Sequence, residues 1–477
     1  MIRTSNTVID SKTIFLLLTI IGITFLGGII VTKVSAGVAV FLFAALIIAI
    51  ASFLSAEVAL YMLIGSMLLS PEFIVGDIAG KAALGRGITL RFDDILLAII
   101  GFSWFLKTAI RKELGLFLRS PLNRPIAYYV TVCLVATLFG LMMGRVRGLT
   151  GFFFVLKYFE YFIVYFMVVN HLRDKRQIER FVMAMLIVSV IVCIVAIAQI
   201  PGGGRVSAPF EGEVGEPNTL GGYLVLMLSI TLGLLLTYGS KKQKVLFVTL
   251  TVFIVISLLA TLSRSSWLAL GPMLLALIYF SKKRMVILVP LILIAVLSPF
   301  ILPANVKKRA LFTFTQRQER GQIEVGGLRI DTSASARLRS WKNVLTRDFI
   351  KHPILGYGVT GYSFLDAQYP RVLAETGLVG FVFFVWLLAA VFKNALYAYR
   401  NTSDPLFSGL SLGYLVGFVA MLAHAIGTNT FIIVRIMEPF WFLTAIIITI
   451  PTIEADELKV DTSGGKQDMA RLQQQTM

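Results

Sequence analysis

Apolar runs of about 20 residues recur along almost the whole chain, and they limit its possible folds more than any other feature. A helix of that length spans the hydrocarbon core of a bilayer. Of the 477 residues, 57% are hydrophobic and only 15% are charged, whereas a soluble domain carries about 25% charged residues. The pattern excludes soluble, disordered and collagen-like chains. It predicts an all-α polytopic integral membrane protein with about 12–14 transmembrane helices.

The predicted spans follow one another closely, and one weak span is a candidate for a re-entrant segment. Their expected positions are near 13–32, 35–54, 57–74, 93–110, 125–143, 151–170, 181–200, 218–238, 245–263, 265–281, 285–302, 376–392, 405–427 and 431–451.

Basic residues indicate how the spans are oriented. The chain carries 44 Lys and Arg against 26 Asp and Glu, a formal charge of +18. Basic clusters occupy the alternate short loops 107–124, 171–180, 239–244 and 282–284. Because such loops stay in the cytoplasm, both termini are predicted to be cytoplasmic, in the cell (cytoplasmic or inner) membrane.

One loop departs from that pattern. Residues 303–374 fall on the outer side, yet they hold twelve Lys and Arg against five Asp and Glu. Long loops cross the membrane largely regardless of charge, and a loop of this length is usually functional or disordered. Apolar residues at helical spacing between Ser335 and Ile350 predict an amphipathic helix. The predicted organisation is therefore 1–12 cytoplasmic tail, 13–302 transmembrane bundle, 303–374 outer catalytic or ligand-binding loop, 375–451 C-terminal transmembrane helices, and 452–477 disordered cytoplasmic tail.

Charged residues inside the spans are functional candidates, because they are costly in a bilayer. Lys157 and Glu160 are three residues apart, as are Arg435 and Glu438, so each pair can meet on one helix face. Structural ion pairing is the simpler interpretation of both.

The chain shows no spacing typical of a metal site. The two cysteines lie inside apolar runs, and the three histidines are far apart in sequence. We therefore expect neither a metal nor a cofactor.

Two arginines stand at predicted outer ends of spans. Arg264 lies in the junction Ser263–Trp267, where it either binds an anion or reaches lipid headgroups. Arg205 precedes Pro217 and Asn218, a plausible helix start whose free N–H groups favour phosphate. An ordinary polar turn explains the same residues.

The outer loop contains the densest group of polar residues. Gly356, Gly358 and Gly361 form a GxGxxG pattern, but no strand precedes it, so we favour a tight backbone turn over a dinucleotide site. Asp366 and Glu375 bracket the return into the membrane. A carboxylate there is either a general base for a sugar hydroxyl or a solvated loop acid.

Several of these segments, in this order, resemble the O-antigen ligase and polysaccharide polymerase family of polytopic membrane glycosyltransferases. The resemblance extends from about residue 85 to residue 450. It is carried by Leu90–Leu97, Lys157–Phe162, Arg205 with Gly215–Asn218, Ser263–Trp267, Arg337–Trp341, His352-Pro353, Gly356–Gly358 and Leu373–Gly380.

The resemblance implies a function. Family members use polyprenyl-diphosphate-linked glycans on the outer face of the membrane, and their arginines hold the diphosphate. That role maps onto Arg205, Arg264 and Arg337. Many ligases carry a His-Asn pair where this chain has Asp366 and Ala367, which favours a polymerase or exopolysaccharide-type member. The expected reaction is inverting and metal-independent transfer of a lipid-linked glycan to an acceptor saccharide or glycolipid.

The candidate residues fall into two groups. Those expected to be catalytic are Asp366, Arg264, Arg205, Arg337 and Glu375. Those expected to bind substrate are Tyr369, Asn218, Gly356, Gly358, Trp341 and Arg339. Expected partners are the glycan donor, the acceptor, the lipid bilayer and other polysaccharide assembly proteins, with no nucleic acid. The alternatives are a flippase for lipid-linked oligosaccharides and a non-catalytic subunit of an export complex.

Overall fold

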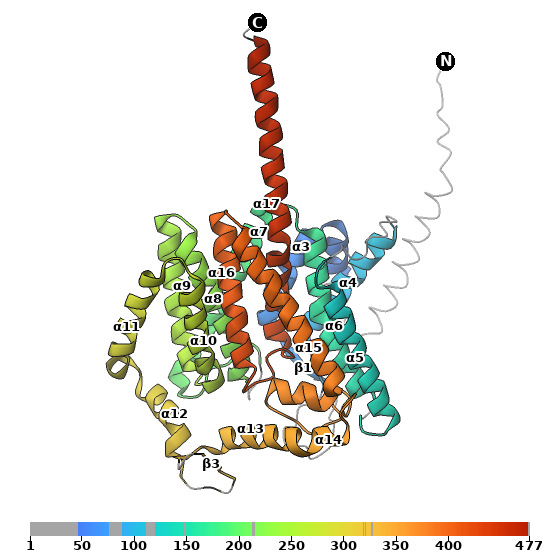
Figure 1. Ribbon diagram of the computed structural model, residues 1–477, viewed down its shortest axis with the longest axis vertical. Coiled ribbons are helices and arrows are strands. Elements are labelled where there is room, and N and C mark those ends of the chain that lie inside the picture. The colour runs from blue at the N-terminus through green and yellow to red at the C-terminus, as the bar shows by residue number, and fades with distance from the viewer. Residues whose placement is uncertain are drawn as a thin grey trace, which may run out of the picture.

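The computed structural model describes residues 46–75, 88–110, 120–146, 148–211, 215–317, 319, 321–325 and 328–475. In these residues the chain is a bundle of α-helices with two short antiparallel hairpins, which confirms the predicted all-α membrane fold (Figure 1). The predicted tail 1–12, the span 13–32 and most of 35–54 lie outside the described residues, although residues 46–54 are helical.

The helices of the bundle follow the predicted spans closely. They are α3 (Ala56–Leu69), α4 (Phe92–Ile110), α5 (Asn123–Met142), α6 (Gly148–His171), α7 (Lys175–Gln199), α8 (Pro217–Thr237), α9 (Lys241–Ala260), α10 (Arg264–Phe280), α11 (Arg284–Ile301), α15 (Gln368–Asn401), α16 (Pro405–His424) and α17 (Val434–Gln475).

The remaining elements connect these helices. They are β1 (Glu72–Val75), β2 (Ile88–Arg91), the 3-10 turn η1 (Ile200–Gly202), α12 (Ala304–Thr315), β3 (Glu324–Val325), β4 (Leu328–Arg329), α13 (Thr332–Asn343), the π-helical turn η2 (Val344–Asp348) and α14 (Phe349–Lys351).

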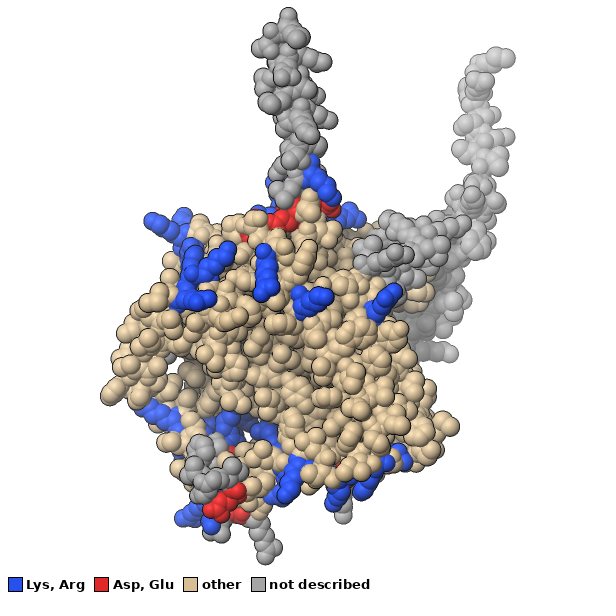
Figure 2. All heavy atoms as spheres, viewed as in Figure 1, with Lys and Arg blue, Asp and Glu red and all other residues tan. Residues whose placement is uncertain are grey.

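The bundle has the dimensions and charge distribution of a multi-pass membrane protein. Nine helices within the described residues are long and apolar enough to cross a membrane, and α3 and α10 are shorter apolar helices. Figure 2 shows Lys and Arg side chains in two bands near opposite ends of the bundle, with an uncharged zone between them. That zone suits the hydrocarbon core.

Helices α8 and α16 form the centre of the bundle and pack backbone to backbone. A Cβ atom added to Gly233 of α8 would lie 2.3 Å from the carbonyl oxygen of Gly409 and 2.6 Å from Cα of Gly413, both in α16. Small residues allow this approach, and close packing drives helix association where lipid offers no hydrophobic gain. By contrast α11 stands apart from the centre of the bundle (Figure 1). Most of its apolar side chains are exposed.

The long segment between α11 and α15 forms a cover at one end of the bundle (Figure 1). Helix α13 lies across the helix ends, and α12 links it to α11 (Figure 1). The predicted amphipathic helix at Ser335–Ile350 is present as α13, η2 and α14, with Val344 buried beneath it.

Two boundaries differ from the sequence-based predictions. Helix α15 begins at Gln368 and is kinked at Gly377, whose φ of 65° is not helical, so a short helical segment precedes the predicted span. The loop predicted for 303–374 therefore ends earlier. Helix α17 continues through Gln475, where a disordered tail was predicted for 452–477. Gln, Glu, Lys and Met in the tail favour this continuation, whereas Gly464 and Gly465 oppose it.

The α8–α16 contact gives a first prediction. Replacing Gly233 with Ala should lower the stability of the purified protein by about 1–3 kcal/mol, because the new methyl group overlaps backbone atoms that cannot move independently. Thermal unfolding in detergent measures the change. The matched control is Gly271→Ala in α10, where no atom lies within 4 Å of the added Cβ. Equal melting temperatures for the two variants would contradict the packing argument.

Candidate active site

The turn between α9 and α10 is the centre of the candidate site. The Ser263 hydroxyl caps α10 by accepting a hydrogen bond from the Ser266 amide at 3.4 Å. Leu262 adopts a φ of 49°, a positive value that is rare for residues other than Gly, Asn and Asp. The Thr261 and Leu262 carbonyls lie in this turn, directly after the C-terminal end of α9. Carbonyl groups at the end of a helix have no partner within the helix and can accept hydrogen bonds from other groups.

Arg205 reaches this turn from the segment between α7 and α8. Its Nε donates to the Thr261 carbonyl at 3.0 Å, and its Nη2 donates to Oδ1 of Asn218 at 3.3 Å. Pro217 occupies the first position of α8, as its sequence predicts, and Asn218 follows. The predicted pair Arg205 and Asn218 therefore lies together at the end of α9.

A chain of polar contacts continues into the bundle from Asn218. The Ser263 hydroxyl donates to Asn218 Oδ1 at 2.8 Å, and the Ser266 hydroxyl donates to Ser263 Oγ at 2.8 Å. The Ser266 oxygen lies 3.1 Å from Nε2 of His424, and Nδ1 of His424 lies 2.8 Å from the Thr430 hydroxyl oxygen. His424 is fully buried. Sequence reasoning missed this residue, because a lone histidine near a span end carries no recognisable pattern.

Arg264 forms an ion pair with the cover. Its Nη1 and Nη2 donate to the two carboxylate oxygens of Asp331 at 2.6 and 2.8 Å. Asp331 also caps α13, accepting from the amides of Ser333 and Ala334. Burial alone would raise the pKa of Asp331, but the Arg264 guanidinium and the α13 amides outweigh it and hold that pKa below its usual value. The pair fixes α13 over the end of α10.

Arg337 of α13 pairs with the candidate base. Its Nη2 donates to Oδ2 of Asp366 at 2.7 Å, and both side chains keep some contact with solvent. Its Nε is buried and has no hydrogen-bond partner among the described residues. Beside them the rings of Trp341 and Tyr369 lie 6.2 Å apart, and the Tyr369 hydroxyl donates to the Leu422 carbonyl.

A fourth arginine, Arg309 of α12, joins the three predicted ones. Its Nε donates to the Leu262 carbonyl at 3.4 Å. Burial lowers the pKa of Arg205 to about 10, helped by the charges of Arg309, Arg264 and Arg337. Burial and the charge of Arg264 likewise lower the pKa of Arg309. Figure 2 shows basic side chains inside the hollow between the bundle and the cover.

Glu375 and the glycines lie to one side of this cluster. Oε1 of Glu375 accepts from Arg371 Nε and from the Thr360 amide, each at 3.1 Å, and the carboxylate is buried. Gly356 and Gly358 adopt φ values of 67° and 89°, and a Cβ on Gly356 would lie 2.5 Å from the Ala374 carbonyl oxygen. This fits the predicted tight turn, which packs directly on α15 just before its kink at Gly377. Arg339 donates to the Gly321 carbonyl in the cover.

The charged residues inside the bundle find partners on other helices. Lys157 Nζ lies 2.9 Å from Asp94 in α4, and Arg435 Nη1 donates to the Pro209 carbonyl at 2.9 Å. Arg435 Nε also lies 3.9 Å from Glu211. Lys157 thus joins α6 to α4. The contacts of Arg435 brace the loop that carries Arg205.

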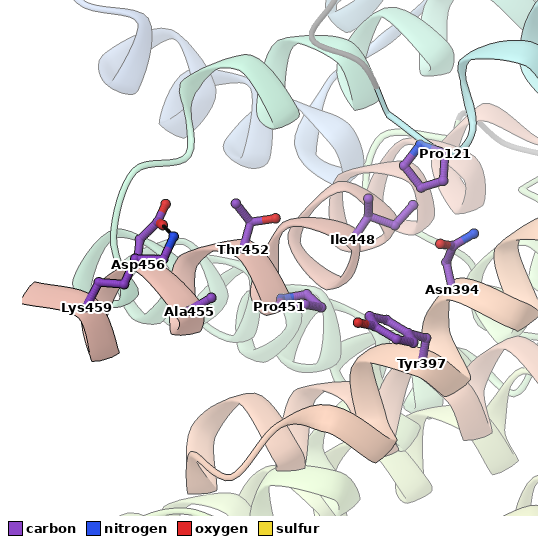
Figure 3. Close-up of a pocket in the computed structure, with 9 residues that line it drawn as sticks. All are labelled: Pro121, Asn394, Tyr397, Ile448, Pro451, Thr452, Ala455, Asp456 and Lys459. Atoms are coloured by element: carbon purple, nitrogen blue, oxygen red, sulfur yellow. Dashed lines mark hydrogen bonds and ion pairs between the residues drawn. The ribbon is translucent and has the colours of Figure 1, made fainter.

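A cavity lies at the opposite end of the bundle (Figure 3). It measures about 420 Å³ and is lined by Pro121, Asn394, Tyr397, Ile448, Pro451, Thr452, Ala455, Asp456 and Lys459. Its two charged residues pair with each other at 2.9 Å. In the part of the chain that the structure describes, no group of three or more His, Cys, Asp or Glu could hold a metal ion.

Helices, cover and arginine cluster together define a polytopic membrane protein with a cationic site at one end. Residues 249–385 match the family model described as O-Antigen ligase. The match confirms the predicted resemblance, over a shorter stretch than expected, and places it within residues 249–385. It includes Arg264, Arg309, Arg337 and Asp366 but not Arg205. No curated protein matches the chain. The match indicates a role in cell-surface polysaccharide biosynthesis, as a membrane glycosyltransferase-like enzyme.

The Arg264–Asp331 pair gives a second prediction. Asp331→Asn should lower the melting temperature at neutral pH, because it removes the ion pair while keeping an acceptor for the α13 amides. Asp331→Ala should cost about 1 kcal/mol more, since the cap is lost as well.

Because of this ion pair, the difference in melting temperature between wild type and Asp331→Asn should depend on pH. A carboxyl whose pKa is lowered by folding contributes stability above its unfolded pKa and loses it as the pH falls through the folded pKa. The melting temperatures of wild type and Asp331→Asn should therefore converge below about pH 4. A constant gap between the two from pH 7 to pH 3 would contradict an ion-pair contribution.

Proposed function

We propose that the protein transfers or polymerises glycan units carried on a polyprenyl diphosphate, at the outer face of the cytoplasmic membrane. The acceptor is a saccharide or glycolipid. The observation that carries the proposal is the cluster of Arg205, Arg264 and Arg337 next to Asp366, beneath a cover at one end of the bundle. A diphosphate leaving group needs charge neutralisation, which guanidinium groups supply without losing their own charge.

The reaction divides between these residues. The acceptor hydroxyl oxygen forms a bond to the anomeric carbon, and the bond from that carbon to the diphosphate oxygen breaks with its electrons. The arginines stabilise the negative charge that develops on the leaving diphosphate. Asp366 accepts the hydroxyl proton. Attack from the face opposite the leaving group inverts the anomeric centre.

The contact between Arg337 and Asp366 links donor binding to base activity. A diphosphate that contacts Arg337 competes with Asp366 for the same guanidinium group. Donor binding then releases the carboxylate toward the acceptor. Trp341 and Tyr369 offer ring faces for the acceptor sugar, and Asn218 and Arg339 are further polar groups of the substrate site.

The position of the site favours an enzyme over a flippase. Transporter sites lie near the middle of the membrane, between repeated halves. Here the arginines lie where α9 ends and α10 begins, next to the cover. In the predicted orientation, with both termini cytoplasmic, this end faces outward. Purified protein in liposomes should extend glycan chains without moving lipid-linked glycan across the bilayer.

Within the family, the Asp366-Ala367 sequence favours a polymerase or exopolysaccharide-type enzyme over a ligase. The glycan profile of a deletion strain distinguishes the two. Single capped units indicate a lost polymerase, and unattached lipid-linked polymer indicates a lost ligase.

The arginines give a third prediction. Arg205→Ala and Arg264→Ala should each lower the rate of glycan transfer by roughly 100-fold or more, because each removes a group that neutralises the leaving diphosphate. Chain growth is followed in a complemented deletion strain and with purified enzyme. Lys342→Ala, an exposed cation on α13, is the control and should behave as wild type. Full activity of both arginine variants would exclude the proposed role and favour a non-catalytic subunit.

Asp366 gives a fourth prediction. Asp366→Asn should reduce the rate by about 100-fold or more, since an amide cannot accept the proton. The control is Glu324→Gln, which removes an exposed carboxylate from the same loop. A wild-type rate for Asp366→Asn would remove this residue as the base, whatever the arginine variants show.

A further inference from the structure

Arg309 and Arg205 are bound to two consecutive carbonyl groups. Arg205 Nε donates to Thr261, and Arg309 Nε donates to Leu262, at the C-terminal end of α9. The end of a helix carries partial negative charge, so it is a favourable place for a cation. This arrangement sets two guanidinium groups from distant segments beside each other.

These two arginines differ from the other two in how their charge is balanced. Arg264 contacts Asp331 and Arg337 contacts Asp366, whereas neither Arg205 nor Arg309 forms an ion pair within the described residues. Four guanidinium groups and two carboxylates leave two positive charges. Holding like charges together without a counter-ion is unfavourable, so an anion that carries two negative charges would relieve the site.

Arg309 also has the geometry of a ligand-binding group. Only its Nε takes part in a hydrogen bond to the described residues. Its Cζ lies 5.7 Å from the centre of the Phe312 ring, one turn further along α12. With Nε anchored and one face against an aromatic ring, the two terminal nitrogens form a fork suited to phosphate oxygens.

We propose that Arg309 is a fourth diphosphate-binding residue, which acts with Arg205 to hold the two negative charges of the lipid-linked donor. The inference rests on the proposed function, because it concerns the donor of that reaction. It gives α12 a specific role, since this helix carries a binding group into the site from the cover. A purely structural alternative is that Arg309 only ties α12 to the turn after α9.

The variant Arg309→Gln distinguishes these roles, because its amide can still donate to the Leu262 carbonyl but carries no charge. With purified enzyme and a polyprenyl-diphosphate-linked donor, we expect the KM for the donor to rise roughly 10-fold to 100-fold, as for loss of a charged hydrogen bond. The KM for the acceptor should stay unchanged. Lys308→Gln, an exposed neighbour on α12, is the matched control.

Inorganic diphosphate provides a second readout without the lipid. It should inhibit the wild-type enzyme competitively against the donor, and Arg309→Gln should weaken this inhibition by a similar factor. Arg309→Lys should recover part of the affinity, because it restores the charge without the fork. The melting temperature of Arg309→Gln should be unchanged or higher, since repulsion from Arg205 and Arg264 is removed.

Two results would overturn the inference. One is a donor KM for Arg309→Gln equal to that of Lys308→Gln. The other is a lower kcat and a lower melting temperature with unchanged KM, as expected of a structural tie. In either case the proposed function stands if Arg205→Ala and Arg264→Ala still lose activity. If those two variants keep full activity, the proposed function itself is wrong.

Discussion

Four guanidinium groups share one partly buried site, so the arginine cluster forms only because other contacts offset their mutual repulsion. Three kinds of contact do this. The carboxylates of Asp331 and Asp366 pair with Arg264 and Arg337, and the carbonyls of the turn after α9 accept from Arg205 and Arg309. Asn218, Ser263, Ser266 and His424 then link this turn to α8 and α16. The site is therefore built on backbone acceptors as much as on charge.

The rest of the bundle keeps those acceptors in place. Close contact between α8 and α16 fixes the helices that carry Asn218 and His424. Arg435 holds the segment of Arg205 from the other side, by donating to the Pro209 carbonyl and to the carbonyls of Leu68 and Ser70 at the end of α3. Charges within an apolar bundle are costly, so their use here indicates how much the position of that segment matters.

Sequence alone predicted the helices and named most residues of the candidate site, for separate physical reasons. Span length and hydropathy fix the helices, and an arginine at a span end, such as Arg264, is conspicuous because few charges surround it. Arg309 escaped prediction because it follows Lys307 and Lys308 on an amphipathic helix and looks like part of a solvated face. The partners of Lys157 and Arg435 were also missed, since spacing along one helix carries no information about neighbouring helices. The polar composition beyond residue 451 predicts a disordered tail, whereas α17 is drawn through Gln475.

The way the charges are balanced also explains how such a site can fold before its substrate arrives. Asp331 and Asp366 neutralise two arginines from within the chain, so folding leaves only part of the positive charge without a partner. Each carboxylate also has a second role, since Asp331 caps α13 and Asp366 is the candidate base. The remaining charge lies on Arg205 and Arg309, which are held by neutral groups that do not compete with an anion for charge. A dianionic headgroup would thus find its strongest attraction at the point where the protein itself has left the charge unbalanced.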